Sequence, residues 1–130
     1  MKKVLAFVVL VAGVYIDAGP LLAHHGRGAT YDMKQEISLK GTISEVSWRN
    51  PHIAVYLDVK DANGKVTTWT IEHSNITTLA MQGYGRTTLK AGQEVTAVIH
   101  PTAAGTPAGL CVKFILPDGK QVFQRGTGVD

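Results

Sequence analysis

The stretch HIAVYLDVKDANGKVTTWTIEH, residues 52–73, has the pattern of a β-hairpin. Apolar and polar residues alternate on both sides of the turn sequence 61–65, as in two strands that each bury one face. Gly64 supplies the left-handed backbone conformation that a three-residue loop requires. With a loop of 62–64, the apolar positions of the two strands lie opposite each other, in the pairs Leu57–Trp69 and Val55–Ile71. The sequence therefore predicts a hairpin with one face in a hydrophobic core.

Further strands are predicted before and after this hairpin. Residues 36–48 (EISLKGTISEVSW) also alternate, and their parity changes between Ile43 and Val46, which indicates a bulge that bends the strand. Turn residues at 49–51 separate this strand from the hairpin. Downstream, the pattern predicts three more strands, at 94–100, 110–116 and 121–123.

One short helix interrupts the strands. Residues 75–83 (NITTLAMQG) begin with Asn75, a favourable N-cap, and finish with Gly83, which is suited to end a helix. Three meandering strands, a helix and two or three further strands predict a mainly β protein. The expected fold is a small OB-like barrel of five to six strands with the helix between strands 3 and 4. A β-sandwich is the alternative.

The beginning of the chain has the pattern of a secretory leader. Lys2 and Lys3 precede an unbroken run of 13 apolar residues, 4–16. A membrane-spanning helix needs about 20 such residues, so the run matches the apolar region of a signal peptide better than a span. We expect cleavage after Ala23, with Ala18 as the second choice, and an uncleaved anchor as the alternative. The mature protein is then periplasmic or secreted and has no membrane span.

The chain divides into four segments. These are a signal peptide at 1–23, an irregular N-terminal arm at 24–35, the β-barrel domain at 36–123 and a flexible tail at 124–130. Losing the leader lowers the formal charge from +3 to +2, with no run of basic residues, which argues against a nucleic-acid partner. The single cysteine, Cys111, excludes an intramolecular disulfide and is expected to pack inside a strand.

Several short motifs lie along the mature chain: His24-His25, Tyr31-Asp32, Gly41-Thr42, Trp48-x-Asn50-Pro51-His52, Trp69, Ile71-Glu72, Leu89-Lys90-Ala91-Gly92 and Pro117-Asp118-Gly119. Together they resemble DUF6152, a family of small exported bacterial proteins of unknown function. The Trp-x-Asn-Pro-His run is the most specific of them, whereas His73 is not a fixed feature of the family. The resemblance supports the fold and the compartment and implies no particular activity.

The histidines are the candidate metal ligands. Cleavage after Ala23 places the α-amine and the ring of His24 where both can bind one ion, and His25 adds a second ring. An all-nitrogen set favours Cu(II) over Ni(II) or Zn(II). His100 ends the fourth predicted strand and is expected near this arm. His52 and His73 form a second candidate pair, for which the alternative is a structural role in which His52 caps backbone groups.

Two functions follow from these residues. The first is an exported β-domain that binds a transition metal, with copper favoured, as a carrier or accessory. The alternative is a non-catalytic OB-like module that binds a protein or a small envelope ligand, with Trp48, Asn50, Tyr56 and Trp69 as ligand-face candidates. Neither the His-Glu-x-x-His zinc motif nor the Gly-x-Ser-x-Gly elbow is present, so we expect no enzymatic activity.

Overall fold

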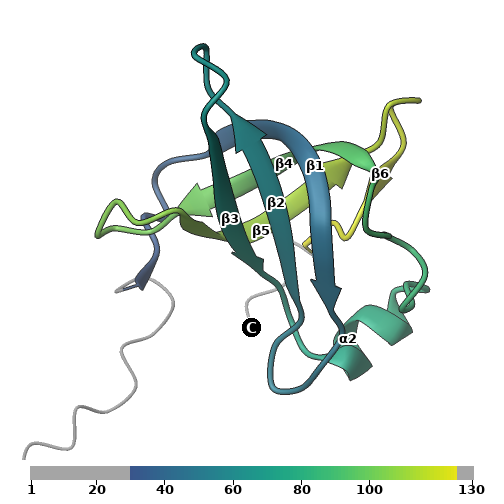
Figure 1. Cartoon of the computed structure of the whole chain (residues 1–130). Coiled ribbons are helices and arrows are strands. Elements are labelled where there is room, and N and C mark those ends of the chain that lie inside the picture. Colours follow the sequence, from purple (N-terminus) through teal and green to yellow (C-terminus); the bar gives the residue numbers. More distant parts are fainter. Residues whose placement is uncertain (1–29, 126–130) are drawn as a thin grey trace, which may run out of the picture.

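The computed structural model describes residues 30–125, which form six strands and one short helix. The predicted signal peptide and the pair His24-His25 lie outside these residues, as does the chain after Arg125. The elements are β1 (Ile37–Ser47), β2 (Ala54–Lys60), β3 (Val66–Glu72), α2 (Ile76–Met81), β4 (Glu94–Pro101), β5 (Ala108–Ile115) and β6 (Gln121–Val122), as Figure 1 shows. No helix within 30–125 combines the length and the apolar character needed to cross a bilayer.

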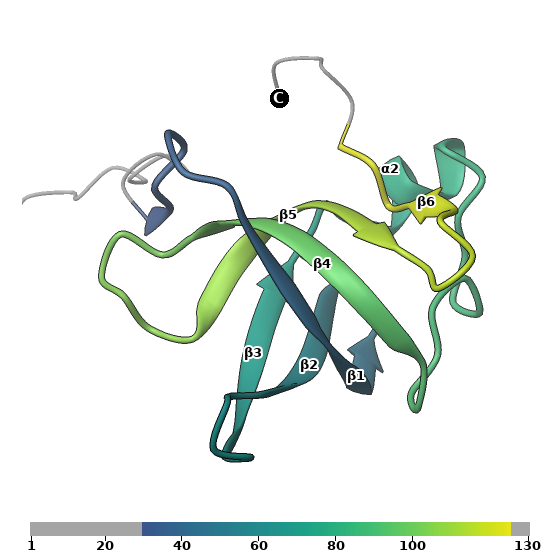
Figure 2. The same cartoon turned by 90° about the horizontal axis from the view of Figure 1, so that it is seen from above.

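The strands close into a barrel. Their order is β3-β2-β1-β4-β5-β6, and a parallel pairing of β3 with β5 joins the two sides of the sheet. Long β1 pairs with β2 through one half and with β4 through the other, and Figure 2 shows it running between these two strands. The predicted mainly β, OB-like barrel with a helix between strands 3 and 4 is confirmed, and the sandwich alternative is wrong.

The hairpin at 52–73 has the register predicted from its apolar pattern. Leu57 pairs with Trp69 and Val55 with Ile71, and Gly64 has the expected positive φ of 81°. The β1–β2 register shifts between Ile43 and Glu45, where the change of parity predicted a bulge. These features follow from the sequence because a one-residue slip would expose the whole apolar face of a strand.

Inward-facing side chains from the barrel strands fill the core, where β1 and β2 approach closely at Gly41. A Cβ on Gly41 would overlap the carbonyl oxygen of Asp58, so this point of the barrel admits no side chain. The fully buried side chains of the core include Ile43, Val55, Leu57, Ile71, Ile99, Cys111 and Phe114.

Phe123 completes the core from the C-terminal end of the domain. β6 stops at Val122, one residue earlier than predicted, because Phe123 adopts a positive φ of 52° that breaks the strand. Its fully buried ring lies against the rings of Trp48, His73, Tyr84 and Phe114, at centroid distances of 6.3, 5.8, 5.2 and 6.1 Å. The chain after β6 is still attached at Arg125, whose N–H donates to the Val112 carbonyl at 2.8 Å.

The helix α2 begins as the sequence predicts, although it is shorter than 75–83. The Asn75 side chain caps it by accepting the Thr78 N–H at 2.9 Å, and Gly83 follows it with a φ of 84°. A second cap comes from the loop between β1 and β2, where the Asn50 side chain accepts the Ile76 N–H at 3.2 Å. This hydrogen bond holds the β1–β2 loop against the helix, and Figure 1 shows the two segments close together.

Candidate functional site

His73 is a structural residue. Its side chain is 3% exposed. Nδ1 accepts the Ser74 N–H at 2.6 Å, and Nε2–H donates to the Phe123 carbonyl at 2.9 Å. Because the main chain uses both ring nitrogens, no lone pair is left for a metal ion. The ring instead ties the end of β3 to the C-terminal segment.

His52 does not share a site with His73. Its side chain is exposed, and its ring makes no hydrogen bond to any of residues 30–125. The Ile53 carbonyl accepts the His73 N–H at 2.8 Å, so the backbones are neighbours as the register predicted. The side chains point to opposite sides of the sheet, since one is buried and the other exposed. The hypothesis of one ion held by both rings has no geometric support.

The four ligand-face candidates do not form one face. Trp48 is 8% exposed and belongs to the core, and the Asn50 side chain is engaged in capping α2. Trp69 packs partly buried against the core from within the barrel. Only Tyr56 lies on the outer face, where it is half-buried. The residues of the most specific motif, apart from His52, therefore serve the fold.

Exposed apolar side chains do not mark a docking surface. Within the described chain, the exposed large apolar residues are Met33, Val66 and Met81. They lie on three separate segments: the turn before β1, the start of β3 and the end of α2. Single exposed apolar residues are normal on a soluble domain.

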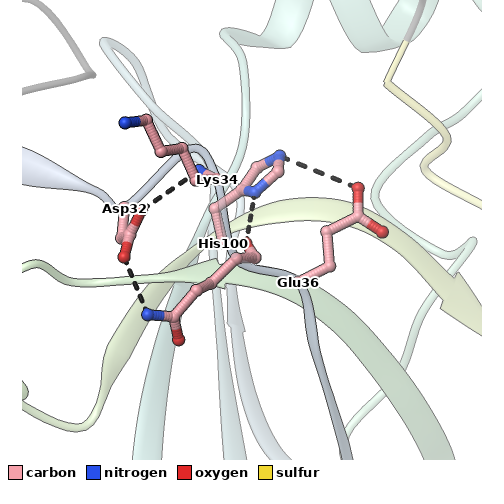
Figure 3. A network of polar contacts seen from close by, with 5 residues as sticks. Asp32, Lys34, Glu36 and His100 are labelled. Carbon is pink, nitrogen blue, oxygen red and sulfur yellow. Dashed lines mark hydrogen bonds and ion pairs between the residues drawn. The ribbon is translucent and has the colours of Figure 1, made fainter.

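Among the described histidines, His100 combines a ring held in place with a nitrogen that makes no hydrogen bond. It lies near the end of β4, and its Nδ1–H donates to the Gln35 carbonyl at 2.7 Å (Figure 3). Nε2 faces the Glu36 carboxylate at 4.0 Å. Because a carbonyl oxygen can only accept, the proton of the neutral ring is on Nδ1, and Nε2 carries the lone pair. Glu36 was not among the predicted site residues, although its position beside the arm is evident in the sequence.

The arm before β1 is folded against the barrel from Thr30 onward. Tyr31 forms an antiparallel bridge with Thr102, and the Asp32 N–H donates to the Pro101 carbonyl at 2.8 Å. Tyr31 is 6% exposed, and its hydroxyl donates to the Glu72 carboxylate at 2.7 Å. The prediction of an irregular arm up to residue 35 missed these contacts, and the isolated Tyr31 was their only signal.

Asp32 organises the turn that connects Tyr31 to His100. Its carboxylate accepts the Lys34 N–H at 3.1 Å and the Gln35 side-chain amide at 2.8 Å, while its carbonyl accepts the Gln35 N–H at 3.1 Å. Figure 3 shows these contacts beside the His100 ring. The Gln35 carbonyl, which fixes the ring, is thus held by a turn of defined geometry.

The predicted pair His24-His25 lies outside the described residues, but its distance along the chain is known. Thr30 follows His25 by five positions along the chain, which corresponds to at most about 18 Å of extended chain. Thr30 itself is attached to the barrel, because its carbonyl accepts the Ala103 N–H at 3.0 Å. The pair is therefore only a short segment away, along the chain, from a residue that is bound to the barrel.

Among residues 30–125, no three histidine, cysteine or acidic side chains form a group able to hold a metal ion. Cys111 is fully buried, which raises the pKa of its thiol well above the ordinary value. Its S–H faces the Phe123 carbonyl at 3.7 Å, so it is a packing residue, as predicted.

Two surface hollows on the described part of the chain are lined by no histidine. One of about 470 Å³ lies on the outer side of β1 and β2, and a neighbouring one of about 310 Å³ shares Lys40 and Glu94 with it. Both are open and carry side chains of mixed charge. They offer neither an activated nucleophile nor a metal-binding group, and they are separate from the His100 contacts.

Comparison with known proteins gives one match. A family model described as "Family of unknown function (DUF6152)" matches residues 12–112, from the N-terminal apolar run into β5. No curated protein and no solved structure matches the chain.

Proposed function

The chain belongs to the DUF6152 family, and we propose that it is an exported, periplasmic metal-binding protein that holds Cu(II) as a carrier or accessory. The observation that carries the proposal is the geometry of His100. Its Nδ1–H is committed to the Gln35 carbonyl at 2.7 Å, and its Nε2 is directed at the base of the arm. The role is one of binding, without catalysis.

This geometry matches that of metal-ligating histidines in general. Such a ring donates its second N–H to a backbone carbonyl or a carboxylate, which fixes the tautomer and makes the other nitrogen a better ligand. Gln35 supplies that carbonyl for His100. Of the three histidines within residues 30–125, His100 alone combines a fixed ring with an available nitrogen.

The remaining ligands come from the arm and its acidic neighbour. After cleavage following Ala23, His24 offers an α-amine and a ring nitrogen, and His25 offers a second ring. Together with Nε2 of His100 they make a nitrogen set that favours Cu(II). Glu36 adds an oxygen: it is 57% exposed and free to rotate, and its 4.0 Å separation from Nε2 suits an ion bound about 2 Å from each atom.

The alternative of a ligand-binding module has weaker support. It requires Trp48, Asn50, Tyr56 and Trp69 to present one face, whereas Trp48 is in the core and the Asn50 side chain caps α2. The metal-binding proposal uses Nε2 of His100 and the Glu36 carboxylate, neither of which makes a hydrogen bond to residues 30–125.

Substitution of His100 tests this proposal. In the mature chain beginning at His24, His100→Gln is expected to weaken Cu(II) binding by roughly tenfold or more, because one member of a multidentate set is lost. Competition with a chelator of known affinity measures the change. His52→Gln is the matched control, since that ring is exposed and outside the proposed site, and it should leave the affinity unchanged. Equal effects of the two substitutions would contradict the proposal.

A further inference from the structure

We infer that Tyr31 is the positioning residue of this site: by binding Glu72 and Thr102, it holds the arm so that the Gln35 carbonyl fixes the His100 ring. The inference rests on the proposed function only for its effect on metal affinity. Its effect on the ring itself needs no metal.

Tyr31 is anchored more firmly than its place in an irregular segment predicts. Its side chain is buried, and its hydroxyl donates to the Glu72 carboxylate at 2.7 Å. Its backbone pairs with Thr102, in the loop that leaves β4. A hydrogen bond to a charged group is stronger than one between neutral groups, so this contact is able to bias the position of a short segment.

The pairing of strands β3, β5 and β4 places Glu72 and His100 in one row of the barrel. Glu72 pairs with Leu110 across the parallel β3–β5 contact, and Leu110 pairs with His100 across β4–β5. Tyr31 and Gln35 thus attach the arm to two side chains of the same row, Glu72 and His100. The arm spans this row as a strap, which we define as residues 30–36.

The turn transmits the position of Tyr31 to Gln35. Asp32 follows Tyr31 directly and accepts three hydrogen bonds, two from Gln35 and one from Lys34. Fixing Tyr31 therefore fixes Asp32, and Asp32 fixes the peptide that carries the Gln35 carbonyl. Without the anchor, this carbonyl moves relative to His100, and the ring proton is free to leave Nδ1 for Nε2, where it blocks the ligand lone pair.

The test compares two tyrosines. Tyr31→Ala removes the anchor, and Tyr31→Phe removes only the hydroxyl. Tyr56→Ala is the control, because Tyr56 is also half-buried on the outer side of the barrel and its hydroxyl makes no hydrogen bond to the described chain. Nitrogen-15 NMR of the metal-free mature protein reports which His100 nitrogen carries the proton, and chelator competition reports Cu(II) affinity.

We expect the wild type and Tyr56→Ala to hold the proton on Nδ1, and Tyr31→Ala to show a mixture of both tautomers. The Cu(II) affinity of Tyr31→Ala should fall by roughly tenfold, at the lower end of what loss of an outer-shell partner costs, with Tyr31→Phe intermediate. If Tyr31→Ala does not fold, the ratio of the two His100 tautomers in Tyr31→Phe decides the test. Unchanged tautomers overturn the inference even if the wild type binds copper. A shifted tautomer in a protein that binds no copper supports the inference and refutes the proposed function.

Discussion

Replacing Phe123 with alanine is expected to lower the free energy of unfolding by about 3–5 kcal/mol, the range found for truncating a buried aromatic ring. The ring is fully buried and contacts four others, contributed by the end of β1, the end of β3, the loop after α2 and β5. Because the substitution leaves a cavity where these segments meet, the loss cannot be recovered by a local shift. Small domains have total stabilities of about 5–15 kcal/mol, so this is a large share.

Urea unfolding monitored by tryptophan fluorescence measures this effect, since Trp48 lies 6.3 Å from Phe123 between ring centroids. The control is Met81→Ala, at a side chain that is 85% exposed, and it should change the stability by less than about 0.5 kcal/mol. Phe123→Leu should give an intermediate loss. If Phe123→Ala and Met81→Ala unfold at the same urea concentration, the C-terminal segment is not part of the core.

The barrel was predictable because its strands obey local rules. The hairpin register follows from two apolar patterns that agree in only one alignment, and Gly64 has the conformation that its loop length requires. The bulge in β1 is visible as a change of parity between Ile43 and Val46. In each case the information lies within a few consecutive residues.

The parts that could not be predicted depend on contacts between distant segments. Tyr31 meets Glu72 across 41 positions, and His73 meets Phe123 across 50. No periodicity shows that a tyrosine in a polar arm will be buried, or that a histidine after a strand will have both nitrogens bound to the main chain. The structural roles of Trp48 and Asn50 could not be predicted for the same reason, because these residues find their partners in Phe123 and α2.

The candidate site was only partly predictable. The position of His100 beside the arm follows from the topology of an OB-like barrel, in which strand four runs antiparallel to strand one and ends where strand one begins. The direction of its ring depends on the Gln35 carbonyl, which no sequence pattern specifies. The separation of the His52 and His73 side chains follows from the alternation of side chains along a strand. In the structure, the His52 side chain is exposed and the His73 side chain is buried.

Replacing His24 with alanine is the second substitution with a large expected effect. In the mature chain it should weaken Cu(II) binding by about 100-fold or more. The ring and the α-amine belong to one residue, so once one of them binds the ion the other binds it at a high effective concentration. The fold should be unchanged, since the substitution alters no strand and no core residue of the barrel described over residues 30–125. Chelator competition gives the affinity, and thermal unfolding checks the fold.

Blocking the α-amine separates the two donors of His24. A mature chain acetylated at its N-terminus keeps every ring and loses one ligand, so it should also bind Cu(II) much more weakly. His52→Ala is the control at a histidine with no role in the proposed site. Undiminished affinity in both His24→Ala and the acetylated chain would refute a terminal chelate.

The central claim is that the start of the mature chain and His100 hold one ion, and ring NMR during copper titration tests it most directly. Paramagnetic Cu(II) broadens the signals of nuclei close to it, and the five histidine rings act as five separate reporters. With one equivalent of Cu(II), the signals of His24, His25 and His100 should broaden together while those of His52 and His73 stay sharp. A sharp His100 signal beside broadened His24 and His25 signals would contradict the shared site.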